Sequence, residues 1–356
     1  MKKILGLFVI ALLALSIMPA VLAVSVGSGI TPDITTEKFE PIVFLCDNRI
    51  VIDDSTEPGR VSAGGQELVE RTNNYAFEGE SIHWTVLAMD KNGIEKLQDV
   101  YATVGDTQGA GNDIEVECKK TTGPSTIPAS CNARILEEEL TAFDSETMQY
   151  YECTLTVETA QSMYGKYWLT VEAVDEYDQA ATIAENENWF LNPVIALSIN
   201  GDLTFEDVRP GTDSYSSTIL VGNDADQTSG VLLDMFISGT DFYDSSSSGA
   251  LCPTTNKLAL ENFRYYATNG AYSTVGTAGA DAEGYRPIEY GIGFNNPNPF
   301  YDSAEILPNT PKVSGYYTAN ILNPGSEMAI TFKLSMPEPC NGDFNEGTIS
   351  FWGEAI

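Results

Sequence analysis

Short runs rich in β-branched and aromatic residues recur along the chain, and Gly, Pro, Asn and Asp separate them. The segment 165–174 alternates apolar and polar side chains, which is the period of a strand with one buried face. Only residues 133–142 have a helical pattern, and that segment is short. The chain is therefore predicted to be all-β.

The predicted strands form two series, one in each half of the chain. In the first half they are 41–46, 49–52, 81–89, 100–104, 114–118, 150–157, 167–174 and 179–183. In the second half they are 194–199, 203–205, 217–221, 231–237, 328–334 and 348–352. Asn92 and Gly93 supply the positive φ of a tight turn, so a hairpin is predicted after 81–89. The last two runs are predicted to be antiparallel strands.

The first 23 residues have the pattern of a secretory signal peptide. Lys2 and Lys3 precede an uncharged apolar stretch at 4–22, and Ala23 completes a site of small residues suited to cleavage. A stretch of about 20 apolar residues can also span a bilayer, so an uncleaved anchor is the alternative. Ser16 and Pro19 favour cleavage. A secreted or cell-surface protein is predicted, with no membrane attachment once the signal is removed.

Removal of residues 1–23 leaves 333 of the 356 residues, which is enough for two domains of ordinary size. Residues 24–40 are rich in Gly, Ser, Thr and Pro and are predicted to be an extended lead-in. The two predicted domains are 41–190 and 191–356, each a β-sandwich.

The chain is strongly acidic, with a formal net charge of −33 that becomes −35 if Lys2 and Lys3 are removed. Such a charge repels phosphate backbones, which excludes nucleic acid as a partner. The hydrophobic content of 43% and aromatic content of 10% distinguish the chain from a disordered acidic tail. The chain is expected to fold.

Six cysteines behind a secretory signal indicate disulfides rather than metal ligands. Pairing within each half joins Cys252 to Cys340. In the first half, one prediction joins Cys131 to Cys153 and leaves Cys46 for Cys118. The alternative joins Cys118 to Cys131 and Cys46 to Cys153. Each unstrained bridge contributes roughly 2 to 4 kcal/mol.

The sequence Gly165-x-Tyr167-x-Leu169, with an acidic turn ending at Asp178, resembles the penultimate hairpin of immunoglobulin-like extracellular modules. The resemblance covers residues 41–190. The Cys and Trp positions do not reproduce the spacing of antibody domains. The resemblance therefore implies an immunoglobulin-like sandwich for the first domain and assigns no binding residues.

A second resemblance rests on Pro324-Gly325, residues 332–337 and residues 347–351. These short motifs are similar to those of secreted prokaryotic sandwich domains, among them surface-layer modules and camelysin-type subunits of biofilm fibres. The whole chain resembles secreted archaeal cell-surface proteins. This likeness implies a structural role at a surface. The second domain is predicted to be a larger, jelly-roll-like sandwich with long aromatic-rich loops.

Tyrosines are frequent in the second half, among Gly, Asn and Pro, and offer large contact areas at low entropic cost. They are candidates for a ligand-binding surface, with packing of loops onto the sandwich as the alternative. Trp189 and Trp352 could stack on a glycan in the same way. The candidate ligand residues are Tyr265, Tyr266, Tyr272, Tyr285 and Tyr290.

Acidic turns make calcium the one cofactor that the sequence suggests, because this ion prefers several oxygen ligands. The candidate metal ligands are Asp175, Glu176, Asp178, Asp224 and Asp226. Neither group has the residue spacing of an EF-hand loop, and Asp is also common in ordinary turns.

No catalytic motif is found in the sequence. The single histidine, His83, lies within a predicted strand, and no nucleophile elbow, phosphate-binding loop or zinc pattern is present. We therefore expect a noncatalytic structural protein of a surface layer, filament or envelope. Its expected partners are copies of itself or other envelope proteins, associated through β-edges. The alternatives are an adhesin or carbohydrate-binding module, with glycans as partners, and a carboxylate-based hydrolase.

Overall fold

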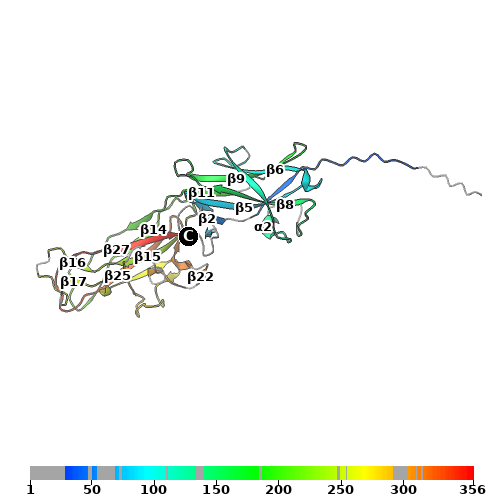
Figure 1. Cartoon of the computed structure of the whole chain (residues 1–356). Coiled ribbons are helices and arrows are strands. Elements are labelled where there is room, and N and C mark those ends of the chain that lie inside the picture. Colours follow the sequence, from blue (N-terminus) through cyan, green and yellow to red (C-terminus); the bar gives the residue numbers. More distant parts are fainter. Residues whose placement is uncertain are drawn as a thin grey trace, which may run out of the picture. The chain divides into compact units, whose positions relative to one another are not determined.

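The computed structural model describes residues 29–46, 50–53, 69–71, 74–109, 111–132, 140–183, 187–246, 249–253, 255–291, 304–309, 311–313 and 316–356. Regular structure in these ranges is almost entirely β-strand, and the strands form several sheets (Figure 1). The prediction of an all-β sandwich fold is therefore confirmed. The predicted signal peptide, 1–23, lies outside the described residues. So does most of the predicted helix 133–142; the described helix is α2 (Ala129–Asn132).

The chain divides into two compact units, Met1–Lys38 and Phe39–Ile356. In the described part of the first unit, residues 29–38 have no regular secondary structure and are exposed. Ile30 and Ile34 are 94% and 78% exposed. These residues belong to the predicted lead-in, 24–40, and two large apolar side chains on it lie in solvent.

Eleven strands of the first half form one continuous set of pairings, in the order β3-β2-β5-β8-β7-β6-β9-β11-β4. β1 pairs with β5 beside β2, and β10 pairs with β9 beside β11. Their bounds are β1 (Ile42–Leu45), β2 (Ile50–Asp53), β3 (Val69–Arg71), β4 (Tyr75–Ala76), β5 (Glu80–Met89), β6 (Leu97–Gly105), β7 (Ile114–Thr121), β8 (Met148–Thr156), β9 (Gly165–Asp175), β10 (Ala180–Ile183) and β11 (Asn188–Leu191).

Strand β7 joins the two layers of this half. Its first part pairs with β6, from Ile114 opposite Val104, and its second part pairs with β8, from Cys118 opposite Cys153. One strand therefore belongs to both layers and closes one side of the sandwich.

The predicted hairpin at Asn92–Gly93 is wrong. β5 pairs with β1, β2 and β8, whereas β6 pairs with β7 and β9, so the two strands are not neighbours in a sheet. Gly93 has a φ of 121° and leads into a short 3-10 helix, η1 (Ile94–Lys96). The connection crosses between layers because the apolar side chains of both strands share one core, and face-to-face packing buries them on both sides.

The second half contains two larger sheets and their extensions. Seven strands form the order β12-β14-β25-β18-β19, with β13 on β25 and β20 on β18. Four strands form β21-β15-β24 with β27 on β15, and smaller groups are β17-β16-β26 and β22-β23. The bounds are β12 (Leu197–Asn200), β13 (Asp213–Tyr215), β14 (Ile219–Asn223), β15 (Leu233–Gly239), β16 (Phe242–Asp244), β17 (Lys257–Leu258), β18 (Phe263–Asn269), β19 (Tyr272–Ser273), β20 (Arg286–Pro287), β21 (Glu289–Tyr290), β22 (Lys312–Val313), β23 (Tyr316–Tyr317), β24 (Ile321–Leu322), β25 (Glu327–Ser335), β26 (Phe344–Glu346) and β27 (Ile349–Ala355). Two further 3-10 helices are η2 (Leu260–Asn262) and η3 (Thr318–Asn320).

Two strand predictions in this half need correction. The final two runs form β25 and β27, but these strands lie in different sheets and do not pair with each other. Residues 203–205 form no strand. Leu203 and Phe205 instead pack their side chains against the core of this half, so their burial does not require a strand partner.

No sheet in the described ranges contains strands from both sides of residue 191. The domain bounds 41–190 and 191–356, and the immunoglobulin-like character of the first half, stay predictions. Among the described residues, no helix has the length and apolar composition needed to cross a membrane.

Three disulfides crosslink the described strands. Cys252 is bonded to Cys340, the pairing predicted from the sequence. Both predicted pairings of the first half are wrong: the structure joins Cys46 to Cys131 and Cys118 to Cys153. Cys118 and Cys153 are directly opposite on the neighbouring strands β7 and β8. Cys131, on α2, is bonded to Cys46, which directly follows β1. Sequence spacing could not show this, because it does not reveal which strands become neighbours.

Peptide mapping of the non-reduced protein should recover the pairs Cys46–Cys131 and Cys118–Cys153. The Cys46→Ala/Cys131→Ala variant should lose about 4 kcal/mol of unfolding free energy, because this bridge closes a separation of 85 residues in the unfolded chain. Denaturant unfolding measures this loss. A crosslinked peptide joining Cys46 to Cys118 or Cys153 would contradict the fold of this half.

Candidate functional site

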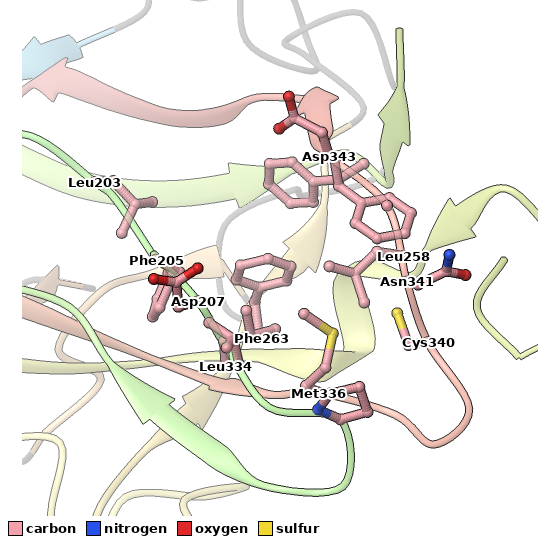
Figure 2. Close-up of a pocket in the computed structure, with 15 residues that line it drawn as sticks. Leu203, Phe205, Asp207, Leu258, Phe263, Leu334, Met336, Cys340, Asn341 and Asp343 are labelled. Atoms are coloured by element: carbon pink, nitrogen blue, oxygen red, sulfur yellow. The ribbon is translucent and has the colours of Figure 1, made fainter. Parts of the chain in front are cut away.

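A cleft with a volume of about 600 Å³ opens in the second half of the chain. Figure 2 shows Leu203, Phe205 and Asp207 on one side of the cleft and Leu258, Cys340 and Asn341 on the other, with Phe263 and Met336 between them. Most of the lining side chains are apolar, and many are only partly buried. The main apolar residues are Leu203, Phe205, Val208, Phe242, Phe263 and Met336.

A second cleft, of about 450 Å³, continues the first and shares Leu203, Phe242 and Phe344 with it. It extends to Ile199 at the end of β12 and to Phe351 on β27. β12 ends the order of its sheet, and β27 pairs with β15 on one side only. We call the two together the edge cleft, because it runs between the edge strands of two sheets.

The two edge strands approach each other at one position. Leu197 on β12 lies next to Gly353 on β27, where a built Cβ would be 3.3 Å from the leucine Cδ2. Further along, Ile199 is 57% exposed, and all seven residues of β27 are only half-buried. The two edges thus meet at Leu197 and separate toward Ile199, leaving apolar surface between them.

Sequence analysis missed this cleft. The available signal was the set of apolar residues Leu203, Phe205 and Val208 on a segment that Asp, Gly and Pro interrupt. The sequence predicts a strand at 203–205 and assigns no role to Val208. Only the position of the segment between two sheet edges shows that their side chains line a cleft.

The chemistry of the edge cleft favours apolar contact. Its polar residues are exposed, and Cys340 is held in a disulfide; the polar residues are Asp202, Asp207, Asn341, Asp343, Asn345 and Thr348. The cleft can accept apolar side chains, with main-chain hydrogen bonding available along a sheet edge.

A carboxylate pair lies across the pairing of β15 and β27. Asp234 is directly opposite Glu354 in the register, and Asp234 is 2% exposed. Burial raises the pKa of Asp234 to about 6, and the charge of Glu354 adds to this, while a 2.7 Å hydrogen bond from Asn320 Nδ2 opposes it. Burial also raises the pKa of Glu354. The attachment of β27 therefore holds two acids whose pKa values are raised by burial.

The structure brings only some of the candidate tyrosines together. The rings of Tyr266 and Tyr285 are 5.6 Å apart, and Tyr215 lies 5.7 Å from Tyr285. Tyr272 is exposed on β19, and the exposed Tyr290 donates a 2.6 Å hydrogen bond to Asp241 Oδ1. Among the described residues, the ring contacts join Tyr285 to Tyr266 and Tyr215 and do not include Tyr272 or Tyr290.

Tyr265 is a correction to the ligand prediction. It lies on the inner strand β18 rather than on a loop, and it is 1% exposed. Its hydroxyl donates to the carbonyls of Glu305 and Ile306, and burial raises its pKa. Trp189 is also buried, at 3% exposed, so neither ring can stack on a ligand.

The predicted metal ligands lie in two separate turns. Asp175 is fully buried, whereas Glu176 forms a 2.8 Å ion pair with Lys96 that lowers its pKa. Asp226 Oδ2 accepts hydrogen bonds from Tyr164 and from the backbone of Val194. The remaining candidates, Asp178 and Asp224, are exposed.

No group of three or more His, Cys, Asp or Glu side chains in the described part of the chain is arranged to hold a metal ion. His83 is on β5, and its Nδ1 atom lies 3.5 Å from Glu152 Oε1 and 3.3 Å from Thr154 Oγ1, both on the neighbouring strand β8. These are contacts within one sheet.

Comparison with known proteins gives little likeness. No family model matches the chain, and no curated protein matches it. One solved structure, described as "a putative secreted protein" from Eubacterium rectale, aligns with 9% sequence identity and a TM-score of 0.19. The alignment covers 90% of this chain and 65% of that structure, so the chain spans less than two thirds of its length.

The raised pKa of Asp234 predicts how stability depends on pH. Below about pH 4 the carboxyl of Asp234 is mostly protonated in both the folded and the unfolded protein. As the pH rises toward 6, this carboxyl ionises first in the unfolded protein, so the free energy of unfolding falls. Asp234 should lower the free energy of unfolding by about 2 to 3 kcal/mol once the pH is above 6. Asp234→Asn should be more stable than the wild type at pH 7 and equal to it near pH 3.5 in denaturant unfolding. Asp99→Asn, at an exposed position on β6, is the control. An Asp234→Asn variant less stable at pH 7 would contradict the assignment.

Proposed function

We propose that this chain is a noncatalytic structural component of an extracellular surface and that it assembles with copies of itself through the edge cleft. Three disulfides support an extracellular protein, because such bonds persist in oxidising compartments. The structural role and the assembly are the proposed part. The observation that carries them is an edge strand, β27, lying along an apolar cleft.

An edge strand presents backbone groups that another strand can pair with, and secreted proteins usually protect such edges with charge, bulges or short length. β27 has seven residues, and its sequence, ISFWGEA, carries one charged side chain. Phe351 and Ile349 of β27 line the cleft. A strand added beside β27 could therefore gain main-chain hydrogen bonds and also bury apolar side chains.

The exposed lead-in of a second copy is the occupant that we propose. Ile30 and Ile34 are four residues apart, so they lie on the same face of an extended chain. Both are almost fully exposed. Two isoleucines with this spacing are suited to a cleft lined by Phe and Leu side chains, and their burial would favour association by roughly 1.5 to 3 kcal/mol each.

The net charge of −33 opposes such assembly, because copies repel one another. Salt screens this repulsion, with a Debye length of about 10 Å at 0.1 M ionic strength. Assembly through apolar contacts should therefore become stronger with rising salt.

A glycan-binding role is the second candidate. The neighbouring rings of Tyr215, Tyr266 and Tyr285 favour it, since partly exposed aromatic rings can stack on sugars. Specific binding on a glycan array that Tyr215→Ala abolishes would support this alternative. Absence of binding to any glycan would count against it.

The assembly is tested with two matched variants that place a charge in an exposed apolar position. Ile199 lies in the edge cleft and is 57% exposed, whereas Val275 lies outside its lining and is 56% exposed. Ile199→Asp should reduce assembly at least about tenfold, the effect of 1.4 kcal/mol, and Val275→Asp should leave it unchanged.

Sedimentation and electron microscopy of the purified protein at several salt concentrations measure this assembly, and circular dichroism checks that each variant is folded. Replacement of both Ile30 and Ile34 by Asp should match the effect of Ile199→Asp. Wild-type protein that stays monomeric at all salt concentrations, or equal effects of Ile199→Asp and Val275→Asp, would refute the proposal.

A further inference from the structure

Two carboxylates are completely buried at one end of the first-half sandwich. Asp90 directly follows β5, and Asp175 is the last residue of β9. Both side chains are 0% exposed. Burial of two acids costs free energy unless hydrogen bonds or cations compensate for the lost water.

Only one oxygen of each carboxylate has a hydrogen-bond partner. Asp90 Oδ1 accepts the backbone N–H of Asn92 at 2.7 Å. Asp175 Oδ1 accepts the N–H groups of Tyr177 and Gln179 at 2.9 and 2.7 Å. The Oδ2 atoms of both Asp residues and the Oε1 atom of Gln179 are buried, and none has a hydrogen-bond partner in the described part of the chain.

The two turns that carry these oxygens are in direct contact. The backbone N–H of Glu176 donates to the carbonyl of Lys96 at 2.9 Å, which joins the turn after β9 to the connection after β5. Gln179 is held in place because its backbone carbonyl accepts a 3.0 Å hydrogen bond from the N–H of Asp175. Burial raises the pKa of Asp90, a hydrogen bond from Asn92 opposes this, and the charge of Asp175 adds to the rise. The two carboxylates are therefore close enough to repel each other.

Lys96, a nearby cation, forms an ion pair with Glu176 and not with the buried carboxylates. Lys96 Nζ lies 2.8 Å from Glu176 Oε1, and its side chain is 32% exposed. The negative charges of Glu95 and Glu176 also raise the pKa of Asp90. The local field thus favours a cation, and the oxygens without partners are of the types that hard cations bind.

We propose that Asp90, Asp175 and Gln179 form a calcium-binding site between these two turns. Calcium accepts carboxylate, amide and backbone carbonyl oxygens together with water in a flexible geometry, which suits two carboxylates and one amide from separate turns. Magnesium demands a stricter octahedral arrangement and loses its water reluctantly. The site does not depend on the proposed assembly, which uses the edge cleft and the lead-in.

This site differs from the one predicted from the sequence. Asp175 belongs to both, but Glu176 is paired with Lys96, and Asp178 is exposed. Asp90 lies 85 residues earlier in the sequence, so only the fold brings it to Asp175.

Calcium titration of the full chain, oxidised and freed of metal by chelation, tests the proposal by calorimetry and thermal unfolding. We expect one calcium ion per chain, with a dissociation constant no weaker than about 10⁻³ M, the range of extracellular modules. Asp90→Asn and Asp175→Asn keep the shape and the accepting Oδ1 atom but remove a charge. Each should weaken binding at least about tenfold. Asp113→Asn, at an exposed Asp just before β7, should bind calcium as the wild type does.

Calcium should raise the unfolding temperature of the wild type and of Asp113→Asn, and it should leave the unfolding temperatures of Asp90→Asn and Asp175→Asn unchanged. No binding up to about 10 mM calcium, ten times the weakest expected constant, would overturn the proposal. Equal binding by all variants, or many weak ions per chain, would also overturn it, because the acidic surface alone would then explain the result. If either Asn variant fails to fold, the stoichiometry of the wild type and the behaviour of the other variant decide the question.

Discussion

The structure depends on burial of alternate side chains between layers of antiparallel sheet. In the first half, β5 and β6 point their apolar residues into one shared core, and β7 passes from one layer to the other. In the second half, β15 is buried along its whole length. This arrangement satisfies the backbone by strand pairing and leaves the ends of each sheet as the places where pairing stops.

The sheet edges decide what the second half can do. β12 and β27 meet near Leu197 and Gly353 and separate beyond them, so apolar side chains line a cleft instead of closing a core. The strong negative charge of the chain keeps copies apart, whereas the cleft favours an apolar strand. The balance between these two effects, which salt changes, would determine when the protein associates.

Both halves contain buried acidic side chains, but their surroundings differ. Asp234 lies in the pairing of β15 with β27, with Asn320 as a hydrogen-bond donor, and burial raises its pKa. Asp90 and Asp175 each use one oxygen to hold a turn and leave the other without a hydrogen-bond partner among the described residues. An acid held by an amide donor is compatible with protonation, whereas two close carboxylates beside an amide oxygen favour a cation.

The sequence by itself determined the fold class and the positions of most strands, because period-two alternation and turn residues are local properties. It also determined that the cysteines form disulfides, and the pairing of Cys252 with Cys340 followed from their isolation in the second half. Only the tertiary structure decided the pairing of Cys46 with Cys131, the edge cleft and the approach of Asp90 to Asp175. These features depend on which strands become neighbours across layers. The packing of whole sheet faces determines those neighbours, and a local sequence pattern does not contain this information.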